Sequence, residues 1–353
     1  MTAFSGSYSP EEVTFLLKVI ELAPLDIESR ERLIQSGQSH YSEMIGPEAP
    51  PDPRYLTIFF DSLERSLGRL ARDCLGLAAQ IASSRPGPVT LVSLARSGTP
   101  VGVILGKIIR EHFKKEVCHY SISVIRDRGV DQNAIRHILA RHEESSVVFI
   151  DGWTGKGVIA RELKKTIKDF NQSQGTSLDG TLAVLSDLAG VAGMAMGADD
   201  WLIPSCLLNS VVAGLISRTI LNDRLIGPDD FHGCLYYRNL ADCDLSRYFV
   251  ERVLERAAAE IASEPKVLTS EPLKENERNR AAQAAVSFLD WAKNEFGVED
   301  ENLIKPGLGE STRVLLRRSP ELLLVRNLTD PEVRHALLLA EQRGILVRED
   351  RNL

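Results

Sequence analysis

The chain has 353 residues, of which 43% are hydrophobic and 26% charged, and its formal net charge is −7 at pH 7. That length suggests two domains, and the acidic balance argues against a uniformly basic surface for nucleic acid. The first ten residues are polar, and the longest apolar stretch, residues 181–198, is interrupted by Asp187. We therefore expect a cytoplasmic protein without a signal peptide or a membrane span.

The region before residue 89 is predicted to be mainly helical. Ser9-Pro10-Glu11-Glu12 is typical of a helix start, with a capping serine followed by proline and glutamate. The apolar face of this first helix would consist of Val13, Leu16, Leu17 and Ile20. We expect a second helix over residues 27–36, a loop over the four prolines of residues 47–53, and a long helix over residues 55–83.

From residue 89 onward, short apolar runs alternate with helical stretches. The predicted strands cover residues 89–94, 117–125, 147–150, 181–185 and 201–203. Such alternation favours an α/β fold with a mainly parallel, doubly wound sheet. In a sheet of this kind, ligands bind outside the carboxyl ends of the strands, so the loops after these strands are the places to search for chemistry.

The first such loop, residues 93–100, follows a strand and opens a helix. Gly98 would let the backbone approach a ligand, Ser97 or Thr99 could cap the helix, and its free N–H groups would face an anion. Arg96 adds a forked cation that suits phosphate oxygens. An ordinary strand-to-helix turn with a surface arginine explains the loop equally well.

The second loop begins with Asp151 at the end of the buried strand over residues 147–150. A carboxylate there could accept ribose hydroxyls, and the following backbone N–H groups could surround a phosphate. The residues expected to contact that phosphate are Gly152, Thr154, Gly155, Lys156 and Gly157. The spacing is not that of a Walker A loop. Together the two loops predict a phosphorylated ribose as ligand, whereas a glycine-rich turn with a solvated lysine is the plainer interpretation.

The stretch Ile150–Val158 resembles the PRPP-binding loop of type I phosphoribosyltransferases. Asp151 takes the second acidic position of that loop, and Ile150 stands in the first. Residues 93–98 resemble the pyrophosphate-binding loop of the same fold. The resemblance implies a type I phosphoribosyltransferase-like parallel sheet flanked by helices, with PRPP or a nucleotide as the ligand.

The same resemblance assigns roles to charged residues. Residues 123–129 fall where that family carries a mobile catalytic loop, so Arg126 and Arg128 would neutralise a departing pyrophosphate. Asp151 would hold the ribose, and Mg²⁺ would bridge pyrophosphate and ribose oxygens. The implied function is phosphoribosyl transfer at the anomeric carbon in a stress-response or nucleoside-like metabolite pathway. Solvated loop charges explain the two arginines equally well.

The full pattern resembles phosphoribosyltransferase-like proteins of bacterial tellurite-resistance stress operons, some of which are labelled StiP-type cysteine proteases. These carry a C-terminal Pelota-like RNA-binding module. The resemblance covers nearly the whole chain and implies a first domain over residues 1–265, a linker over 266–280 and a Pelota-like domain over 281–353. The distribution of charge also supports a separate module. Residues 302–353 contain nine basic and seven acidic residues and are therefore slightly basic, whereas the whole chain has a net charge of −7.

The start of this C-terminal module resembles the element by which Pelota and L7Ae proteins bind RNA, with Gly309 in place of an asparagine. The residues that the resemblance assigns to RNA binding are Gly307, Glu310, Thr312, Arg313 and Arg317. An apolar strand over residues 322–325 and a helix that begins at Asp330-Pro331-Glu332 would complete a small α/β fold. A small cap with a solvated basic face is the alternative interpretation.

The five cysteines include no CxxC pair, which argues against a zinc site or a disulfide framework. Cys206 is predicted to begin a long helix, where a thiol can have a lowered pKa, and His232 could act as its base. This is the basis of the first alternative function, a cysteine hydrolase or protease, although a small buried cysteine would look the same.

A second alternative is a non-catalytic sensor in which nucleotide binding is coupled to RNA binding. Asp187, after the strand over residues 181–185, is either a further pocket carboxylate or a turn cap. Asn209 and Ser210 could line a pocket for a base or a ribose. A homodimer is compatible with the sequence.

Overall fold

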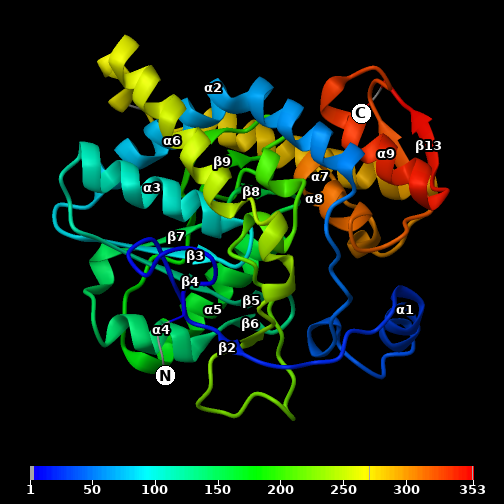
Figure 1. The fold of residues 1–353 in the computed structure, drawn as a ribbon, viewed down its shortest axis with the longest axis horizontal. Coiled ribbons are helices and arrows are strands. Elements are labelled where there is room, and N and C mark those ends of the chain that lie inside the picture. The colour runs from blue at the N-terminus through cyan, green and yellow to red at the C-terminus, as the bar shows by residue number, and fades with distance from the viewer. Residues whose placement is uncertain (1–3, 270, 352) are drawn as a thin grey trace.

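A mostly parallel seven-stranded sheet forms the centre of the first module (Figure 1). The computed structural model describes residues 4–269, 271–351 and 353. The strand order is β1-β4-β3-β7-β9-β10, with β8 beside β9, and all these pairs are parallel. The strands are β1 (Thr14–Phe15), β3 (Val89–Leu94), β4 (Val117–Ile122), β7 (Val147–Ile150), β8 (Trp153–Thr154), β9 (Leu182–Asp187) and β10 (Met194–Gly197). Ser93 of β3 lies opposite Ile150 of β7, so the loops after these two strands meet at one edge.

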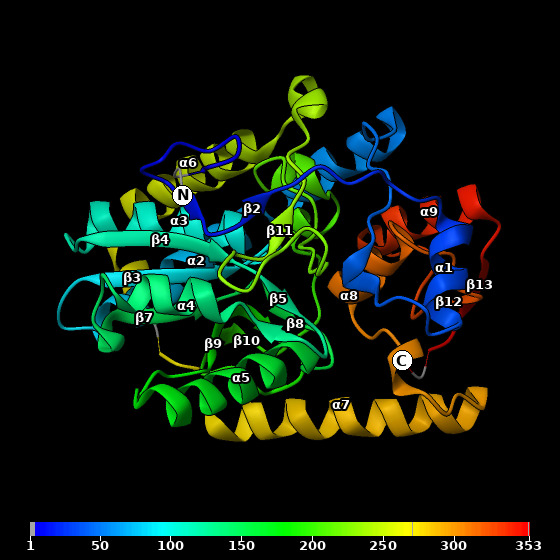
Figure 2. The ribbon, with the colours of Figure 1, turned by 90° about the horizontal axis from the view of Figure 1, so that it is seen from below.

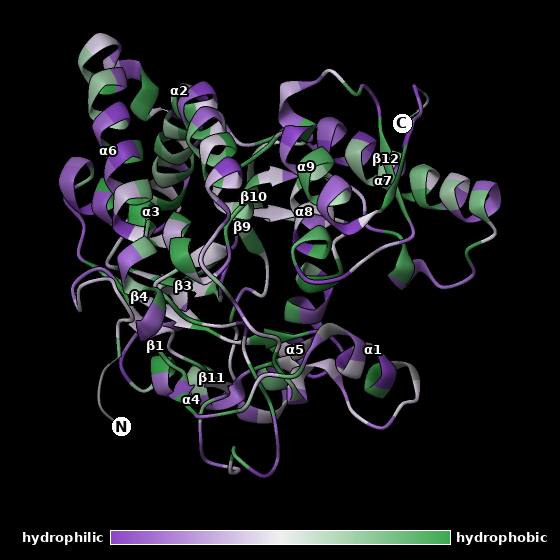
Figure 3. Cartoon of the chain, turned by 45° about the vertical axis from the view of Figure 1, so that its right-hand side comes forward, coloured by the Kyte–Doolittle hydropathy of each residue, from purple (hydrophilic) through white to green (hydrophobic). Residues whose placement is uncertain are grey.

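Two layers of helices cover the sheet. One face packs against α2 (Pro53–Ser84), α3 (Gly98–His112) and α6 (Ser246–Ser263), and the other against α4 (Gln132–Leu139) and α5 (Val158–Gln174) (Figure 1). Hydrophobic and hydrophilic residues alternate along α2 and α6, as expected of helices with one face on a core (Figure 3).

The long helix α2 begins where the sequence dictates a helix start. Asp52 caps it by accepting hydrogen bonds from the N–H groups of Arg54 and Tyr55, and Pro53 occupies its first position. Its apolar side supplies fully buried residues such as Phe59 and Leu70 to the main core, which it shares with α3 and α6. This helix therefore fixes one wall of the first module.

The C-terminal module is a small α/β unit beside the first module. It consists of α8 (Leu308–Leu315), β12 (Leu322–Val325), α9 (Arg334–Arg343) and β13 (Leu346–Glu349). The two strands pair in parallel. Helix α7 (Glu275–Phe296) runs beneath α5 and connects the two modules (Figure 2). Its capping glycine, Gly297, adopts the left-handed conformation that commonly ends a helix.

Most of the predicted elements are present, with shifted ends. The helices expected over residues 27–36 and 55–83 are α1 (Ile27–Gln35) and α2. The expected strand over residues 117–125 divides into β4 and β5 (Val124–Ile125), and β5 pairs with β6 (Gly129–Val130). Helix α7 begins at Glu275, inside the stretch over residues 266–280 that was expected to be a linker. The α/β class with a mainly parallel sheet is confirmed.

The first predicted helix is wrong. The Glu12 carboxylate accepts a hydrogen bond from the Ser9 N–H, as a helix start would, but the chain then extends into β1 and β2 (Lys18–Val19). β1 joins the edge of the main sheet, and β2 pairs with β11 (Gly233–Cys234). The apolar residues of this segment are buried on both sides of an extended chain, so tertiary pairing overrides the local capping signal.

Two further predictions around residue 200 are wrong. Residues 201–203 form no strand, and the last strand of the sheet is β10, in a glycine-rich stretch. Cys206 ends a single turn of 3-10 helix, Pro204–Cys206, rather than beginning a long helix. A helix of that length has no N-terminal anion site of the expected kind. Within the described residues, every helix is too short or too polar to cross a membrane.

Candidate functional site

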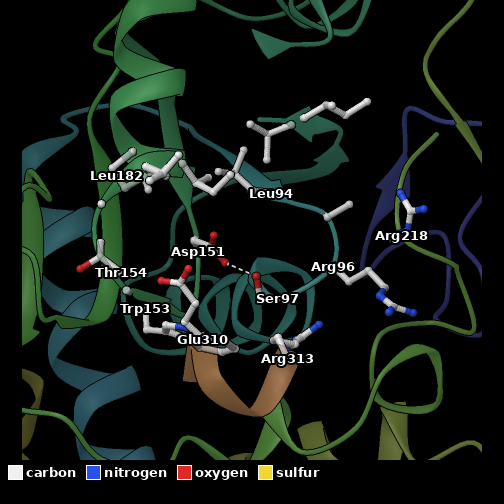
Figure 4. A pocket seen from close by; sticks show the side chains of 18 of the residues that line it. Leu94, Arg96, Ser97, Asp151, Trp153, Thr154, Leu182, Arg218, Glu310 and Arg313 are labelled. Atoms are coloured by element: carbon white, nitrogen blue, oxygen red, sulfur yellow. Dashed lines mark hydrogen bonds between the residues drawn. The ribbon is translucent and has the colours of Figure 1, made fainter. Parts of the chain in front are cut away.

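A cavity of about 270 Å³ lies where the two modules meet (Figure 4). We call its first-module side the floor, which consists of the loop after β3, the end of β7 and the loop between β8 and α5. We call the side formed by the C-terminal module the roof. It consists of two residues of α8, Glu310 and Arg313, and of Arg317, which follows that helix. The loops that were predicted to bind phosphate thus surround one cavity, which the second module covers.

Asp151 lies at the centre of the floor. Its Oδ1 accepts a hydrogen bond from the Ser97 hydroxyl at 2.5 Å and another from the Gly152 N–H at 2.8 Å (Figure 4). Burial raises the pKa of this carboxyl to about 6, against the opposing effect of the two hydrogen bonds. Asp151 can therefore take up or release a proton near neutral pH.

Two of the predicted phosphate ligands have structural roles. A Cβ atom on Gly98 would lie 2.4 Å from the Ile150 carbonyl oxygen, so glycine is required for the close approach of two loops. The Thr99 hydroxyl is hydrogen-bonded to that of Ser121, 2.8 Å away in the interior. The Ser97 backbone precedes α3 without a side-chain cap, so neither predicted cap hydrogen bond is formed.

The loop between β8 and α5 binds a carboxylate from the second module. The Lys156 N–H donates a hydrogen bond to Glu310 Oε2 at 3.2 Å, and a Cβ on Gly155 would collide with the same carboxylate. Lys156 Nζ donates to the carbonyl oxygen of Glu301. The Thr154 hydroxyl donates to Asp187 Oδ1 at 2.8 Å. Glu310 therefore lies against the N–H groups that were expected to hold phosphate.

Asp187 is a turn cap rather than a pocket carboxylate. It is fully buried, and besides the Thr154 hydroxyl it accepts hydrogen bonds from the N–H groups of Val191 and Ala192. Gly157, with φ near 74°, takes the left-handed conformation before α5 begins. These contacts hold the loop in place without leaving its hydroxyl or carboxylate free.

Arginine side chains gather on one side of the cavity. Arg96 is only 4% exposed and is bound to Glu48 at 2.7 Å and to Asn209 Oδ1 at 2.9 Å. Arg313 lies over the Trp153 ring, and burial together with the charge of Arg96 lowers its pKa to about 10. The expected phosphate ligand of the first loop is thus already paired with a carboxylate.

Arg126 and Arg128 lie outside the cavity. Arg126 forms a hydrogen bond with Asn302 and an ion pair with Asp127, and Arg128 forms an ion pair with Glu43 at 2.8 Å. Neither arginine lines the cavity, although Val124 and Ile125 of β5 do.

Cys206 is fully buried between the modules. Burial raises the pKa of its thiol to about 12, while Arg313 and a hydrogen bond with the Thr312 hydroxyl lower it. The same hydroxyl lies 2.6 Å from His335 Nε2. Burial lowers the pKa of His335 to about 3, so its imidazole is neutral at pH 7. The Cys206 thiol, the Thr312 hydroxyl and the His335 imidazole are therefore neighbours in the interior.

The predicted pairing of Cys206 with His232 is not formed. The His232 ring bonds the Ser123 hydroxyl at 2.8 Å, its backbone N–H donates to Asp131, and it lines a different cavity. The other four thiols have pKa values raised by burial, and no side-chain hydroxyl or imidazole contributes to their shifts.

Comparison with known proteins gives the family. A model described as "Tellurite-like stress resistance cysteine protease StiP" matches residues 6–254, and one described as "PELOTA RNA binding domain" matches residues 283–353. "Cysteine protease StiP" of Acinetobacter baylyi is 38% identical over 339 residues, which cover 94% of this chain and 86% of that protein. The chain belongs to the StiP family. No solved structure matches it.

Membership of the StiP family corrects the main functional prediction. The expected group, with a Pelota module at its C-terminus, is confirmed, but phosphoribosyl transfer is wrong, because the family model and the relative are both described as cysteine proteases. The geometry gives physical reasons. Asp151 lacks an acidic neighbour at position 150, and Arg126 is hydrogen-bonded to Asn302 rather than lining the cavity. The type I phosphoribosyltransferase fold itself stays a prediction.

The binding of Mg²⁺ stays a prediction. Within residues 4–269, 271–351 and 353, no three His, Cys, Asp or Glu side chains are grouped so that they could hold a metal ion. Asp151 alone on the floor does not supply the oxygen ligands that Mg²⁺ requires. We therefore derive no step through a metal in this StiP-family chain.

The residues assigned to RNA face the first module. Glu310 and Arg313 line the cavity, the Thr312 hydroxyl is fully buried, and the Leu308 N–H beside Gly307 donates to Asp200. Gly309 lies against the Trp153 ring, where a Cβ would be 2.3 Å from the indole nitrogen. The assignment of these residues to RNA binding stays a prediction, and it requires the modules to separate. The assigned residues are Gly307, Glu310, Thr312, Arg313 and Arg317.

The sequence did not point to three residues of the site. Glu48 comes from the proline-rich loop, which was interpreted only as a connection, and Arg218 had no motif around it. His335 stands on the apolar side of a short helix, where a lone histidine resembles any buried residue. Glu48 and Arg218 belong to the first module, whereas His335 comes near Cys206 only because the second module docks.

Proposed function

We propose that this StiP-family chain is a cysteine peptidase whose nucleophile is Cys206. One observation carries the assignment, namely the buried Cys206 thiol beside Thr312, whose hydroxyl lies 2.6 Å from His335 Nε2. A cysteine nucleophile needs a nearby base and a group that orients that base. The printed name of the relative, "Cysteine protease StiP", supports the same chemistry.

In the reaction, the thiol proton passes to His335, directly or through the Thr312 hydroxyl, as the sulfur attacks the peptide carbonyl carbon. The carbon–nitrogen bond then breaks, the amine leaves with the proton, and water hydrolyses the thioester to regenerate the thiol. Arg313 would stabilise the thiolate, since a neighbouring cation lowers the pKa of a thiol.

The closed arrangement is a resting form in this proposal. The pKa of Cys206 is raised to about 12 and that of His335 is lowered to about 3, so proton transfer between them is strongly unfavourable. A movement of α8 that admits water would reverse both desolvation effects. Because Cys206 belongs to the first module and His335 to the second, activity should require entry of water while the two modules stay docked.

The test compares single cysteine variants of the full chain with fluorescein-labelled casein as substrate. Cys206→Ser is expected to abolish hydrolysis, and His335→Gln to lower the turnover rate at least tenfold by removing the base. Cys118→Ser and Cys243→Ser are the matched controls and should retain activity. Loss of activity in a control, or its persistence in Cys206→Ser, would overturn the assignment.

A chemical measurement supports the kinetic one. Iodoacetamide labelling followed by peptide mass spectrometry reports which thiols react. We expect slow labelling of Cys206 in the resting form and faster labelling in mild urea, where the modules begin to part. Labelling of Cys206 that never precedes global unfolding would contradict a nucleophile that opens to solvent.

A further inference from the structure

The cavity between the modules carries more positive charge than its carboxylates balance. Four arginines line or border it, from both modules: Arg96, Arg218, Arg313 and Arg317. Glu48 pairs with the first of them, and Asp151 lies nearby, so four cations face two carboxylates. Glu310 is matched separately by Lys305 at 3.3 Å. A net charge of two thus remains on the arginine side, which is unfavourable in a buried place.

Three of these guanidinium groups each keep a nitrogen without an acceptor. Arg96 Nε, Arg218 Nη1 and Arg313 Nε are buried without a hydrogen-bond partner. The described residues form no hydrogen bond or ion pair with Arg313, whose contact is the face of the Trp153 ring, 5.5 Å from its guanidinium carbon. Buried donors in native proteins are almost always satisfied. Unsatisfied donors around a cavity therefore indicate an acceptor that binds there.

The charges of the roof and the floor act on one another. The pKa of Arg317 is lowered well below its usual range by burial and by the nearby charges of Arg96 and Arg313. Its Nη2 is 3.4 Å from Asn209 Oδ1, the same amide oxygen that Arg96 contacts at 2.9 Å. Guanidinium groups of both modules thus converge on one polar point, and an anion at that point would be attracted by all of them.

We infer that this cavity binds a phosphate-bearing anion that bridges Arg96 of the first module to Arg313 and Arg317 of the second. Guanidinium forks match phosphate oxygens in geometry as well as in charge. The cavity, of about 270 Å³, suits pyrophosphate or a small phosphate ester, and it excludes a folded RNA. The inference stands apart from the peptidase proposal, because it requires no reaction.

A bridging anion would hold the modules together. Arg313 follows Thr312 directly and lowers the pKa of Cys206, so an anion bound to Arg313 would keep α8 over the thiol. The ligand would then stabilise the closed arrangement and slow any approach to Cys206. Phosphate binding and thiol access are linked in this way by one helix.

Calorimetric titration of the full chain tests the site, with pyrophosphate and ribose 5-phosphate as probes. Binding should weaken with added salt, and the tighter probe tells whether the site takes an inorganic anion or an ester. Arg313→Met and Arg317→Met should each lower the affinity on the order of tenfold or more, since each removes a charge-assisted hydrogen bond. Arg326→Met, on an exposed arginine of the same module, should leave it unchanged.

Thermal unfolding separates this role from a merely structural one. Without ligand, Arg317→Met should raise the melting temperature, because it relieves repulsion among buried cations, and it should remove the increase that pyrophosphate causes. A lowered melting temperature with the pyrophosphate effect retained would overturn the inference. So would an absence of binding to both probes, or binding of a short single-stranded RNA through these arginines without binding of either small anion.

The unmodified chain provides a test that needs no variant. Pyrophosphate should slow iodoacetamide labelling of Cys206 and leave the labelling of the half-buried Cys243 unchanged. Equal labelling with and without pyrophosphate would contradict a bridging anion. This result does not depend on peptidase activity, so failure of the anion site and failure of the peptidase proposal are distinguishable.

Discussion

Asp151 and Arg96, on the floor of the cavity, have charged or polar partners within the first module, whereas Arg313 on the roof has no hydrogen-bond partner among the described residues. Asp151 accepts hydrogen bonds from Ser97 and Gly152, and Arg96 is bound to Glu48. On the roof, Arg313 has only an aromatic face beside it. Since an unpaired buried charge is unfavourable, the roof is the half of the site that depends on something else.

This difference indicates which half of the site is rigid. The floor is formed by loops after neighbouring parallel strands, and the hydrogen bonds of Asp151 have both partners within the first module. The roof acquires its surroundings only by docking. We therefore expect changes in the floor to affect the stability of the first module, and changes in the roof to affect how the modules associate.

The largest effect is expected for Gly98→Ala on the floor. The new Cβ would lie 2.4 Å from the Ile150 carbonyl oxygen and 3.1 Å from the Asp151 Cα, both backbone atoms that cannot move away easily. We expect the free energy of unfolding to fall by about 3 kcal/mol, which is the upper end of the range for overpacked cores. Urea denaturation of the two proteins would measure this difference.

Gly152→Ala is the matched control for this substitution. Its Cβ would meet only the Ser97 carbonyl oxygen, at an ordinary 3.6 Å. The expected change is within roughly 0.5 kcal/mol, as for most substitutions that cause no clash. Equal destabilisation by the two alanines would show that the floor does not require the close approach of its loops.

The next effect concerns the Asp151 carboxyl and has a defined pH dependence. Its pKa in the folded chain is about 6, above the ordinary 3.8, so the folded state favours the protonated form. The contribution of this carboxyl to the free energy of unfolding is fully present below pH 3.8 and is lost as the pH rises through 6. Asp151→Asn keeps both acceptor hydrogen bonds without the charge, and should stabilise the chain by about 2 kcal/mol near pH 8 and hardly at all near pH 4.

Asp187→Asn is the control for that substitution. Asp187 accepts on both carboxylate oxygens, so an amide would place a donor against the Ala192 N–H or against the hydroxyl and N–H groups on the other oxygen. This variant should be destabilised at both pH values. A loss of stability in Asp151→Asn near pH 8 would instead mean that the floor needs the negative charge.

The floor could be predicted from the sequence because its signals are local. Apolar runs at residues 89–94 and 147–150 identified two strands, and the polar and glycine residues after them identified the loops. Parallel pairing then brings such loops together without further information. The same local reasoning failed at Ser9–Glu12, where the capping contact forms but pairing with β4 determines the conformation.

The roof could not be predicted in this way, because no local pattern records how two modules dock. Gly309 appeared to be a departure from an RNA-binding element, yet it allows α8 to approach Trp153 of the first module. Glu310 and Arg313 were assigned to RNA, and His335 had no assignment. Their surroundings arise from contacts between residues about 100 to 150 positions apart, which only the folded arrangement specifies.

The smallest effect is expected for Glu310→Gln, which weakens the contact between roof and floor. The amide can still accept a hydrogen bond from the Lys156 N–H of the floor, but this bond loses the negative charge that strengthens it. We therefore expect a loss of roughly 0.5–1 kcal/mol in the docking of α8. Iodoacetamide labelling of Cys206 should then become roughly threefold faster. The exposed Glu341→Gln should leave the labelling rate unchanged, and slower labelling in Glu310→Gln would mean that Glu310 holds the modules apart rather than together.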